Sequence, residues 1–310
     1  MRVAVIGRSD ALFHSAKALI ENGYEVPLIV TSKAAPEYGF NEESFEKLAD
    51  EIGARFIYSP VLNDKLADIK EVGEMDIAIS ANYTGILSQP MIDLFRLGVL
   101  NAHGGDLPRY RGNACQAWAI LNGEKRVGFC IHKMVGGQLD SGDIIARNYL
   151  EISENTKVGA ILDWISEIAP SMFLEAISAL KENPSYRLAS QSTDAKDILR
   201  CYPRMPQDGA ISWSSDAIDI LRLVNASNEP YAGAFCYFNG KKMTVWDAEL
   251  QSDGENFLAV PGQVTEISDG DVVVAAGQGK IRIKMIEYQS KRGSPGDLIT
   301  SIRTRLTDGI

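Results

Sequence analysis

Short apolar strands that alternate with amphipathic helices constrain the fold of this chain more than any other feature. The strand patterns are rich in branched and small apolar residues and lie at 2–7, 25–30, 55–58, 76–81 and 98–100. Helical patterns separate them; the first has Leu12, Ala16 and Leu19 at helical spacing. Strands that are joined through helices pair in parallel. The pattern therefore predicts an α/β domain with a parallel-rich, Rossmann-like sheet. The G-x-G-x-x-G pattern is missing after the first strand, so a dinucleotide site is not expected.

The last third of the chain has a different pattern. Residues 183–210 contain three prolines and little apolar periodicity, and several short strands with turn residues follow them. We predict a catalytic domain at 1–185, a linker at 186–210 and a small OB-like β-barrel at 211–310. Pro170 is expected to kink or split the helix at about 157–182. The polar tail 290–310 is expected to fray.

Composition limits the classes of partner. The net charge is −10, and residues 201–310 carry 11 Lys and Arg against 14 Asp and Glu, so nucleic-acid binding is not favoured. No apolar run is long enough to span a membrane, and the N-terminus has no secretory pattern. The four cysteines lack C-x-x-C spacing. We expect reduced thiols in a cytoplasmic protein, without disulfides or a metal site.

Polar residues follow one of the apolar strands directly. Asn101 and His103 come at the carboxyl end of the strand that begins at residue 98, two residues apart, so they point the same way. Asp140 follows another apolar strand, in a glycine-flanked loop. An amide, an imidazole and a carboxylate together can stabilise an oxyanion and move protons. Taken singly, these residues are more often structural, and His132 is expected to be an ordinary half-buried strand residue.

The whole string carries more weight than any residue in it. NAHGGDLPRYRG at 101–112, followed by LDSGDII at 139–145, resembles the folate-dependent formyltransferases. The segments RMPQDGAISW at 204–213 and NEPYAGAFCYFNGKKMTVWDAEL at 228–250 resemble the joining segment and C-terminal domain of sugar-nucleotide formyltransferases. The resemblance extends over most of the chain.

The resemblance implies a site. Asn101, His103 and Asp140 would be catalytic, with the carboxylate favouring the charged form of His103. N10-formyltetrahydrofolate would be the co-substrate, with no metal. Its expected contacts lie in three loops and comprise Gly85, Ile86, Leu87, Asn113, Val135, Gly136, Gly137, Gln138 and Leu139. The chain departs from the family pattern at Gly105, which lacks the usual hydroxyl, and at Asp106, which replaces an apolar residue.

The acceptor stays open between classes. The sugar-type segments and the acidic C-terminal domain favour the amino group of a nucleotide-linked amino sugar, as in lipopolysaccharide or O-antigen synthesis. The first alternative is methionyl-tRNA, which predicts a basic channel and salt-sensitive RNA binding. A formyltetrahydrofolate hydrolase would release formate without an acceptor, and an inactive folate- or nucleotide-binding module would have no activity to lose. We expect small-molecule substrates, no membrane partner, and an assembly for which a homodimer is left open.

Overall fold

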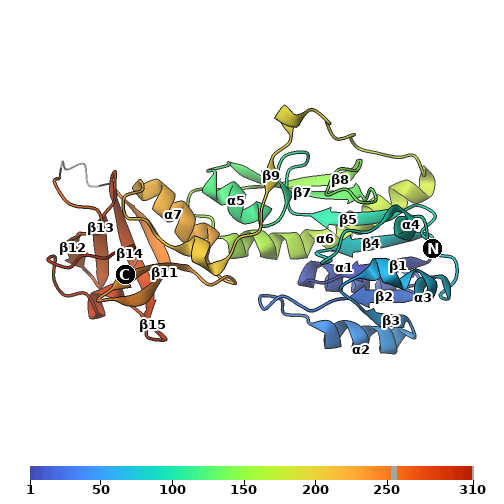
Figure 1. The fold of residues 1–310 in the computed structure, drawn as a ribbon, viewed down its shortest axis with the longest axis horizontal. Helices are drawn as coiled ribbons and strands as arrows, with labels where there is room; N and C mark the ends of the chain where they lie inside the picture. Colours follow the sequence, from blue (N-terminus) through green and yellow to red (C-terminus); the bar gives the residue numbers. More distant parts are fainter. Residues whose placement is uncertain (253–256, 309–310) are drawn as a thin grey trace. The chain divides into compact units, whose positions relative to one another are not determined.

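The computed structural model describes residues 1–252 and 257–308, which separate into two compact units (Figure 1). Unit 1 comprises Met1–Cys115, Val127–Leu150 and Leu162–Tyr202, and unit 2 comprises Gln116–Arg126, Glu151–Ile161 and Pro203–Ile310. The first part of the expected linker, residues 186–202, therefore packs with unit 1. A short parallel pair joins it there, between β6 (Arg111–Gly112) and β9 (Arg200–Cys201).

Unit 1 is built on a seven-stranded sheet with the order β3-β2-β1-β4-β5-β7-β8. Its strands are β1 (Val3–Gly7), β2 (Leu28–Thr31), β3 (Arg55–Tyr58), β4 (Ile77–Ala81), β5 (Val99–His103), β7 (Arg126–Lys133) and β8 (Ile144–Glu151). The first five pair in parallel, whereas β7 runs antiparallel to β5. The predicted Rossmann-like, parallel-rich sheet is confirmed.

Helices lie in the connections between these strands, and the last helix follows β8. They are α1 (Asp10–Glu21), α2 (Glu42–Ile52), α3 (Leu66–Lys70), α4 (Gln89–Ile92), α5 (Cys115–Leu121) and α6 (Val158–Glu182). Every residue of β1 and β4 is buried, as expected for inner strands with both faces covered. Polar groups at the carboxyl ends of β4 and β5 can therefore be held on a rigid support.

Helix α6 is the helix in which the sequence predicts a kink or a split at Pro170. Pro170 lies inside it, yet the helix is continuous over 25 residues rather than split. A proline in a helix interior costs about 3 kcal/mol. Apolar residues along α6, among them Ile161, Phe173 and Ile177, are fully buried. Burying side chains of this size contributes roughly 1.5–3 kcal/mol each, so packing outweighs the local cost.

Unit 2 contains an antiparallel sheet with the order β10-β11-β14-β13-β12, and β15 pairs with β14. The elements are α7 (Ala217–Ala226), β10 (Ala234–Phe238), β11 (Lys241–Gln251), β12 (Val264–Ser268), β13 (Asp271–Ala275), β14 (Lys280–Tyr288) and β15 (Lys291–Gly293). Asn239 and Gly240 both have positive φ at the β10–β11 turn, which is the hairpin geometry their sequence favours.

The C-terminal tail closes this sheet and does not fray. Thr307 pairs with Tyr237 on one edge strand, while the Thr304 carbonyl accepts from Val264 on the other. Leu306, between them, is buried. The expectation of a frayed tail is wrong for residues 290–308, because this segment pairs with the sheet through its backbone and buries an apolar side chain.

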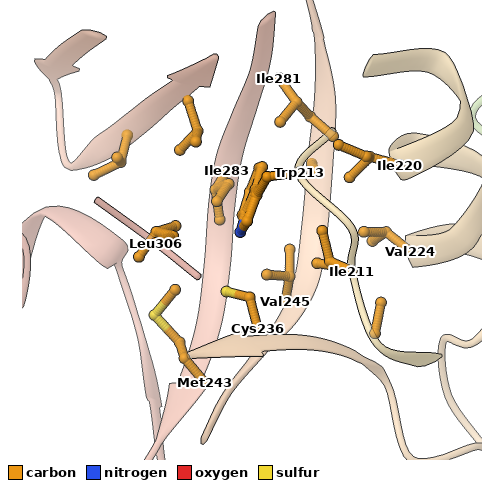
Figure 2. Packing of buried hydrophobic residues seen from close by; sticks show 14 of the residues in the cluster. Ile211, Trp213, Ile220, Val224, Cys236, Met243, Val245, Ile281, Ile283 and Leu306 are labelled. Atoms are coloured by element: carbon orange, nitrogen blue, oxygen red, sulfur yellow. The ribbon is translucent and has the colours of Figure 1, made fainter. Parts of the chain in front are cut away.

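Trp213 lies in the hydrophobic core of unit 2. Figure 2 shows its indole between side chains of the sheet, including Val245 and Ile283, and Ile220 of α7. Its side chain is 2% exposed, and its Nε1–H has no hydrogen-bond partner among the described residues. The core is therefore well filled but carries one unsatisfied donor.

Candidate active site

The pairing of β5 with β7 brings two of the polar side chains together. Asn101 is paired with His132 across the antiparallel ladder, and His103 with Cys130. Residues paired in this way place their side chains on the same face of the sheet. The Asn101 Nδ2 lies 3.2 Å from the His132 Nε2. His132, which the sequence analysis expects to be an ordinary half-buried strand residue, is thus part of the same cluster as Asn101.

Asp140 reaches this cluster from the loop that follows β7. Its Oδ2 lies 3.6 Å from the His103 Nδ1, and its Oδ1 lies 3.4 Å from the His132 Nε2. The Gly112 N–H donates to Oδ2 over 3.0 Å. The three residues singled out from the sequence are therefore brought together, with one carboxylate set between two imidazoles.

The loop that carries Asp140 needs a glycine at position 142, because its backbone there passes very close to the end of β7. A Cβ on Gly142 would lie 1.9 Å from the Lys133 carbonyl oxygen. Asp140 itself has φ +47°, a region that non-glycine residues rarely occupy. The Asp-Ser-Gly order thus reflects a tight turn that aims the carboxylate at the histidines.

Backbone carbonyls set the orientation of both imidazoles. The Tyr110 carbonyl oxygen lies 2.6 Å from the His103 Nε2, and the Lys133 carbonyl oxygen lies 2.9 Å from the His132 Nδ1. A carbonyl can only accept, so these two ring nitrogens carry the protons. In the neutral rings, the unprotonated nitrogens are the His103 Nδ1 and the His132 Nε2. Both of them face Asp140, so the site can accept a proton at any of three groups.

Burial and charge act against each other at these groups. Burial raises the pKa of Asp140, but His103, His132 and the Gly112 N–H lower it more, so the net pKa lies below its usual range. Burial lowers the pKa of His103 by more than Asp140 and the Tyr110 carbonyl raise it. The expected charged form of His103 is therefore not the one that the buried site favours.

The departure at Gly105 has a structural reason. A Cβ at this position would lie 2.3 Å from the Tyr110 carbonyl oxygen and 2.7 Å from the His103 Nε2. The loop therefore passes against the imidazole too closely for any side chain. Glycine at this position is what allows the Tyr110 carbonyl to reach the ring.

Gln191 is a second residue that the sequence analysis missed. Its Nε2 donates to the Asp140 carbonyl over 2.9 Å and to the Gly142 carbonyl over 2.7 Å. Its Oε1 accepts from Arg111, whose Nη2 lies 2.7 Å away. Gln191 lies in the segment predicted to be a linker, where no periodic pattern marked it. It holds the turn that carries Asp140.

Two of the loops expected to contact folate lie side by side. The Gly137 N–H donates to the Leu87 carbonyl over 3.0 Å, and the Gly136 N–H donates to the Gln89 Oε1 over 3.0 Å. Gly85–Leu87 and Val135–Leu139 thus form one continuous rim after β4 and β7. Ile86 is 51% exposed on this rim, whereas Leu87 is buried. An exposed apolar side chain suits a flat ring, so Ile86 fits this use better than Leu87.

Asn113 is placed in the loop after β6. It is exposed, and its backbone N–H donates to the Cys201 carbonyl over 3.2 Å.

The four cysteines are buried and form no disulfide. Within residues 1–252 and 257–308, no cluster of three or more His, Cys, Asp or Glu side chains could hold a metal ion. In the same ranges, no helix has the length and apolar character needed to cross a bilayer.

Known families match both parts of the chain. The model described as "Formyl transferase" matches residues 1–177, and "Formyl transferase, C-terminal domain" matches residues 204–301. The chain is 29% identical to a methionyl-tRNA formyltransferase of Acetivibrio thermocellus over 300 residues, covering 94% of this chain and 93% of the relative. It is 29% identical to the same enzyme of Pelotomaculum thermopropionicum over 318 residues, covering 100% and 98%.

Solved structures share the fold at lower identity. WlaRD, a sugar 3N-formyl transferase crystallised in the presence of dTDP and 5-N-formyl-THF, has a TM-score of 0.65 at 17% identity, covering 91% of this chain and 97% of that one. HypX from Aquifex aeolicus in complex with tetrahydrofolic acid also has a TM-score of 0.65 at 17% identity. The match covers 97% of this chain but 47% of that longer chain.

Proposed function

The chain belongs to the formyl transferase family, and from this premise we propose that it moves a formyl group from N10-formyltetrahydrofolate to a primary amine. One observation carries the proposal. Asp140 lies between the His103 and His132 imidazoles, beside the Asn101 amide, at the carboxyl end of β5. These side chains bring together an amide that can donate a hydrogen bond to an oxyanion and groups that can accept a proton. Transfer through a tetrahedral intermediate requires both.

Asn101 would bind the formyl oxygen. One N–H of its side chain is directed to the His132 Nε2, which leaves the second N–H for a ligand. As the acceptor amine attacks the formyl carbon, the oxygen becomes negatively charged and this hydrogen bond strengthens. A single donor of this kind contributes about 10²-fold or more to the rate.

His103 and Asp140 would carry the proton. The attacking amine becomes positively charged when its C–N bond forms, and it loses one proton to the pair of His103 and Asp140. The same proton then passes to N10 as the bond between N10 and the formyl carbon breaks. The products are a formamide and tetrahydrofolate, with no net proton released. The two groups are coupled, so the proton belongs to the pair rather than to one residue.

The donor is inferred from family membership and from the rim after β4 and β7. Ile86 offers an exposed apolar surface there, beside the backbone of Gly136 and Gly137. The HypX structure was described with tetrahydrofolic acid, which supports folate as the donor class for this fold. N10-formyltetrahydrofolate and the residue assignments around it stay predictions.

Methionyl-tRNA is the acceptor with the stronger support. The curated relatives named above act on it by their printed names, and they match this chain over both domains. We therefore place it ahead of the amino sugar that the sequence segments favoured. The ranking of the two acceptors rests on similarity over the whole chain, at 29% identity, and not on an observed contact with an acceptor.

A nucleotide-linked amino sugar is the second candidate, and net charge favours it. The chain carries −10 overall, which weakens attraction to an RNA backbone. The fold likeness to WlaRD is compatible with this acceptor as well. A cytoplasmic location and a homodimer stay predictions for either acceptor.

Formyl transfer to different acceptors, each supplied in its own reaction, tests the proposal. The protein is incubated with formyl-labelled N10-formyltetrahydrofolate and, in separate reactions, methionyl-tRNA, a panel of UDP-, GDP- and dTDP-linked amino sugars, or no acceptor. We expect label in methionyl-tRNA, lost on raising salt from 50 to 200 mM. Label in a sugar replaces the first acceptor with the second. Formate released without an acceptor favours a hydrolase, and no turnover of any kind contradicts the proposal.

A further inference from the structure

A polar network lies beside the site, separate from Asp140. The Tyr149 hydroxyl donates to the Asp106 Oδ1 over 3.0 Å, and the Arg147 Nη1 lies 3.7 Å from the same oxygen. Arg147 and Tyr149 are two residues apart on β8, so both point to one face of the sheet. We call Asp106, Arg147 and Tyr149 the Asp106 network. It explains why a carboxylate stands where the family pattern has an apolar residue.

The network holds the backbone of the loop after β5. The Arg147 Nη2 donates to the Leu107 carbonyl, directly after Asp106 in the chain. The side chains of Asp106 and Arg147 are 30% and 23% exposed, so this ion pair is only partly screened by water. The loop is therefore fixed to β8 at two successive residues, through a side chain and through a carbonyl.

The other end of the same loop contacts the imidazole of His103. The Tyr110 carbonyl accepts from the His103 Nε2 over 2.6 Å, and from the Cys115 thiol over 2.9 Å. The backbone of Gly105 lies against this carbonyl, where a Cβ would come within 2.3 Å. A loop packed on itself so tightly has little room to adjust. A shift at residues 106–107 must therefore move the Tyr110 carbonyl.

We propose that Asp106, Arg147 and Tyr149 are positioning residues that hold the Tyr110 carbonyl on the His103 Nε2, and so fix the tautomer whose Nδ1 accepts protons beside Asp140. If the carbonyl withdrew, the buried Nε2–H would keep only the Cys115 Sγ, a weak acceptor 3.8 Å away. Leaving such a donor unpaired costs about 1–3 kcal/mol, so the proton would move to Nδ1, where Asp140 can accept it. The nitrogen needed for catalysis would then be blocked.

Nitrogen-15 NMR of the imidazoles tests this without substrate. The chain has three histidines, so the ring signals can be assigned with single variants. We expect the Nε2–H tautomer for His103 in the wild type and a rise of the Nδ1–H form in Tyr149→Phe and Arg147→Leu. The control is Arg96→Leu, which removes another Arg–Asp pair of unit 1, joined over 2.6 Å to Asp76. It should keep the wild-type tautomer.

Kinetics give the second readout, and this part rests on the proposed function. Tyr149→Phe and Asp106→Asn should lower kcat about 10-fold, which is less than the roughly 10²-fold or more that acid–base catalysis contributes. The KM for the formyl-folate should stay within about twofold of the wild-type value. If the tautomer of His103 is unchanged in both Tyr149→Phe and Arg147→Leu, the proposal is overturned. If Arg147→Leu fails to fold, Tyr149→Phe, which loses one oxygen, decides alone. Absence of formyl transfer by the wild type would contradict the proposed function, while the tautomer would still decide the role of the network.

Discussion

Gln191 offers the sharpest single-residue test of how the site is held. Its side chain donates to the carbonyls of Asp140 and Gly142 and accepts from Arg111 through Oε1. Replacement by Glu keeps the shape and strengthens the contact with Arg111, because a carboxylate binds a guanidinium more strongly than an amide does. The same change turns an oxygen toward two carbonyl oxygens that lie 2.9 and 2.7 Å from the present nitrogen. The perturbation therefore acts on the Asp140 turn and not on the size of the side chain.

The expected loss can be worked out from these contacts. Two donated hydrogen bonds contribute about 0.5–1.5 kcal/mol each, and repulsion between oxygens adds to the loss, so the turn should lose roughly 2 kcal/mol. Asp140 has φ +47°, so the turn has an alternative with less backbone strain. A loss of about 2 kcal/mol lowers the ratio of the competent turn to the alternative turn roughly 30-fold, and kcat should fall by up to about that factor. Gln191→Ala should fall less, about 10-fold, because water can replace the donors.

Single-turnover formyl transfer at saturating formyl-folate measures this effect, with thermal unfolding recorded beside it. Gln207→Glu is the matched control, since Gln207 is exposed and the substitution adds the same charge. It should leave the rate within twofold of the wild type. A Gln191→Glu rate equal to the wild type, in a folded protein, would refute the reasoning that Gln191 holds the Asp140 turn.

Three further outcomes are expected. Folding lowers the pKa values of His103 and Asp140, so the unfolded chain binds more protons in acid than the folded chain does. The free energy of unfolding should therefore fall below about pH 6.5, at up to about 1.4 kcal/mol per pH unit from His103. His103→Gln should reduce this slope, as measured by chemical denaturation at several pH values. His132→Phe should lower kcat about 10- to 100-fold without weakening folate binding in calorimetry, because Asn101 and Asp140 lose a shared partner. Trp213→Phe should change the free energy of unfolding by less than about 1 kcal/mol, because it removes an unpaired donor, whereas Trp213→Ala should cost about 3–5 kcal/mol.

Local patterns predicted the main elements and drew attention to three polar side chains, which the resemblance to formyltransferases then singled out. Strands of buried apolar residues can be recognised from their composition, and Asn101 and His103 lie at the carboxyl end of such a strand. Asp140 was found because a glycine turn after a strand leaves a recognisable string. In these cases the information lies within a few neighbouring residues.

The partners of these residues could not be found in the same way. His132 meets Asn101 because β7 runs antiparallel to β5 in one particular register, which no local pattern gives. Gln191 reaches Asp140 across 51 residues of sequence, from a segment without periodicity. The continuous helix through Pro170 has a similar cause, since tertiary packing outweighs local preference. The features that the sequence analysis missed depend on contacts between residues that are far apart in the chain.

The central claim is that Asp140 and the His103 imidazole beside it together carry the proton during formyl transfer. Single-turnover transfer by Asp140→Asn, measured with formyl-folate binding by calorimetry, tests it most directly, because the amide keeps an acceptor for the Gly112 N–H but cannot take the proton. We expect binding within about threefold of the wild type and a rate lower by about 10²-fold or more. A rate close to the wild type, with binding intact, would contradict the account.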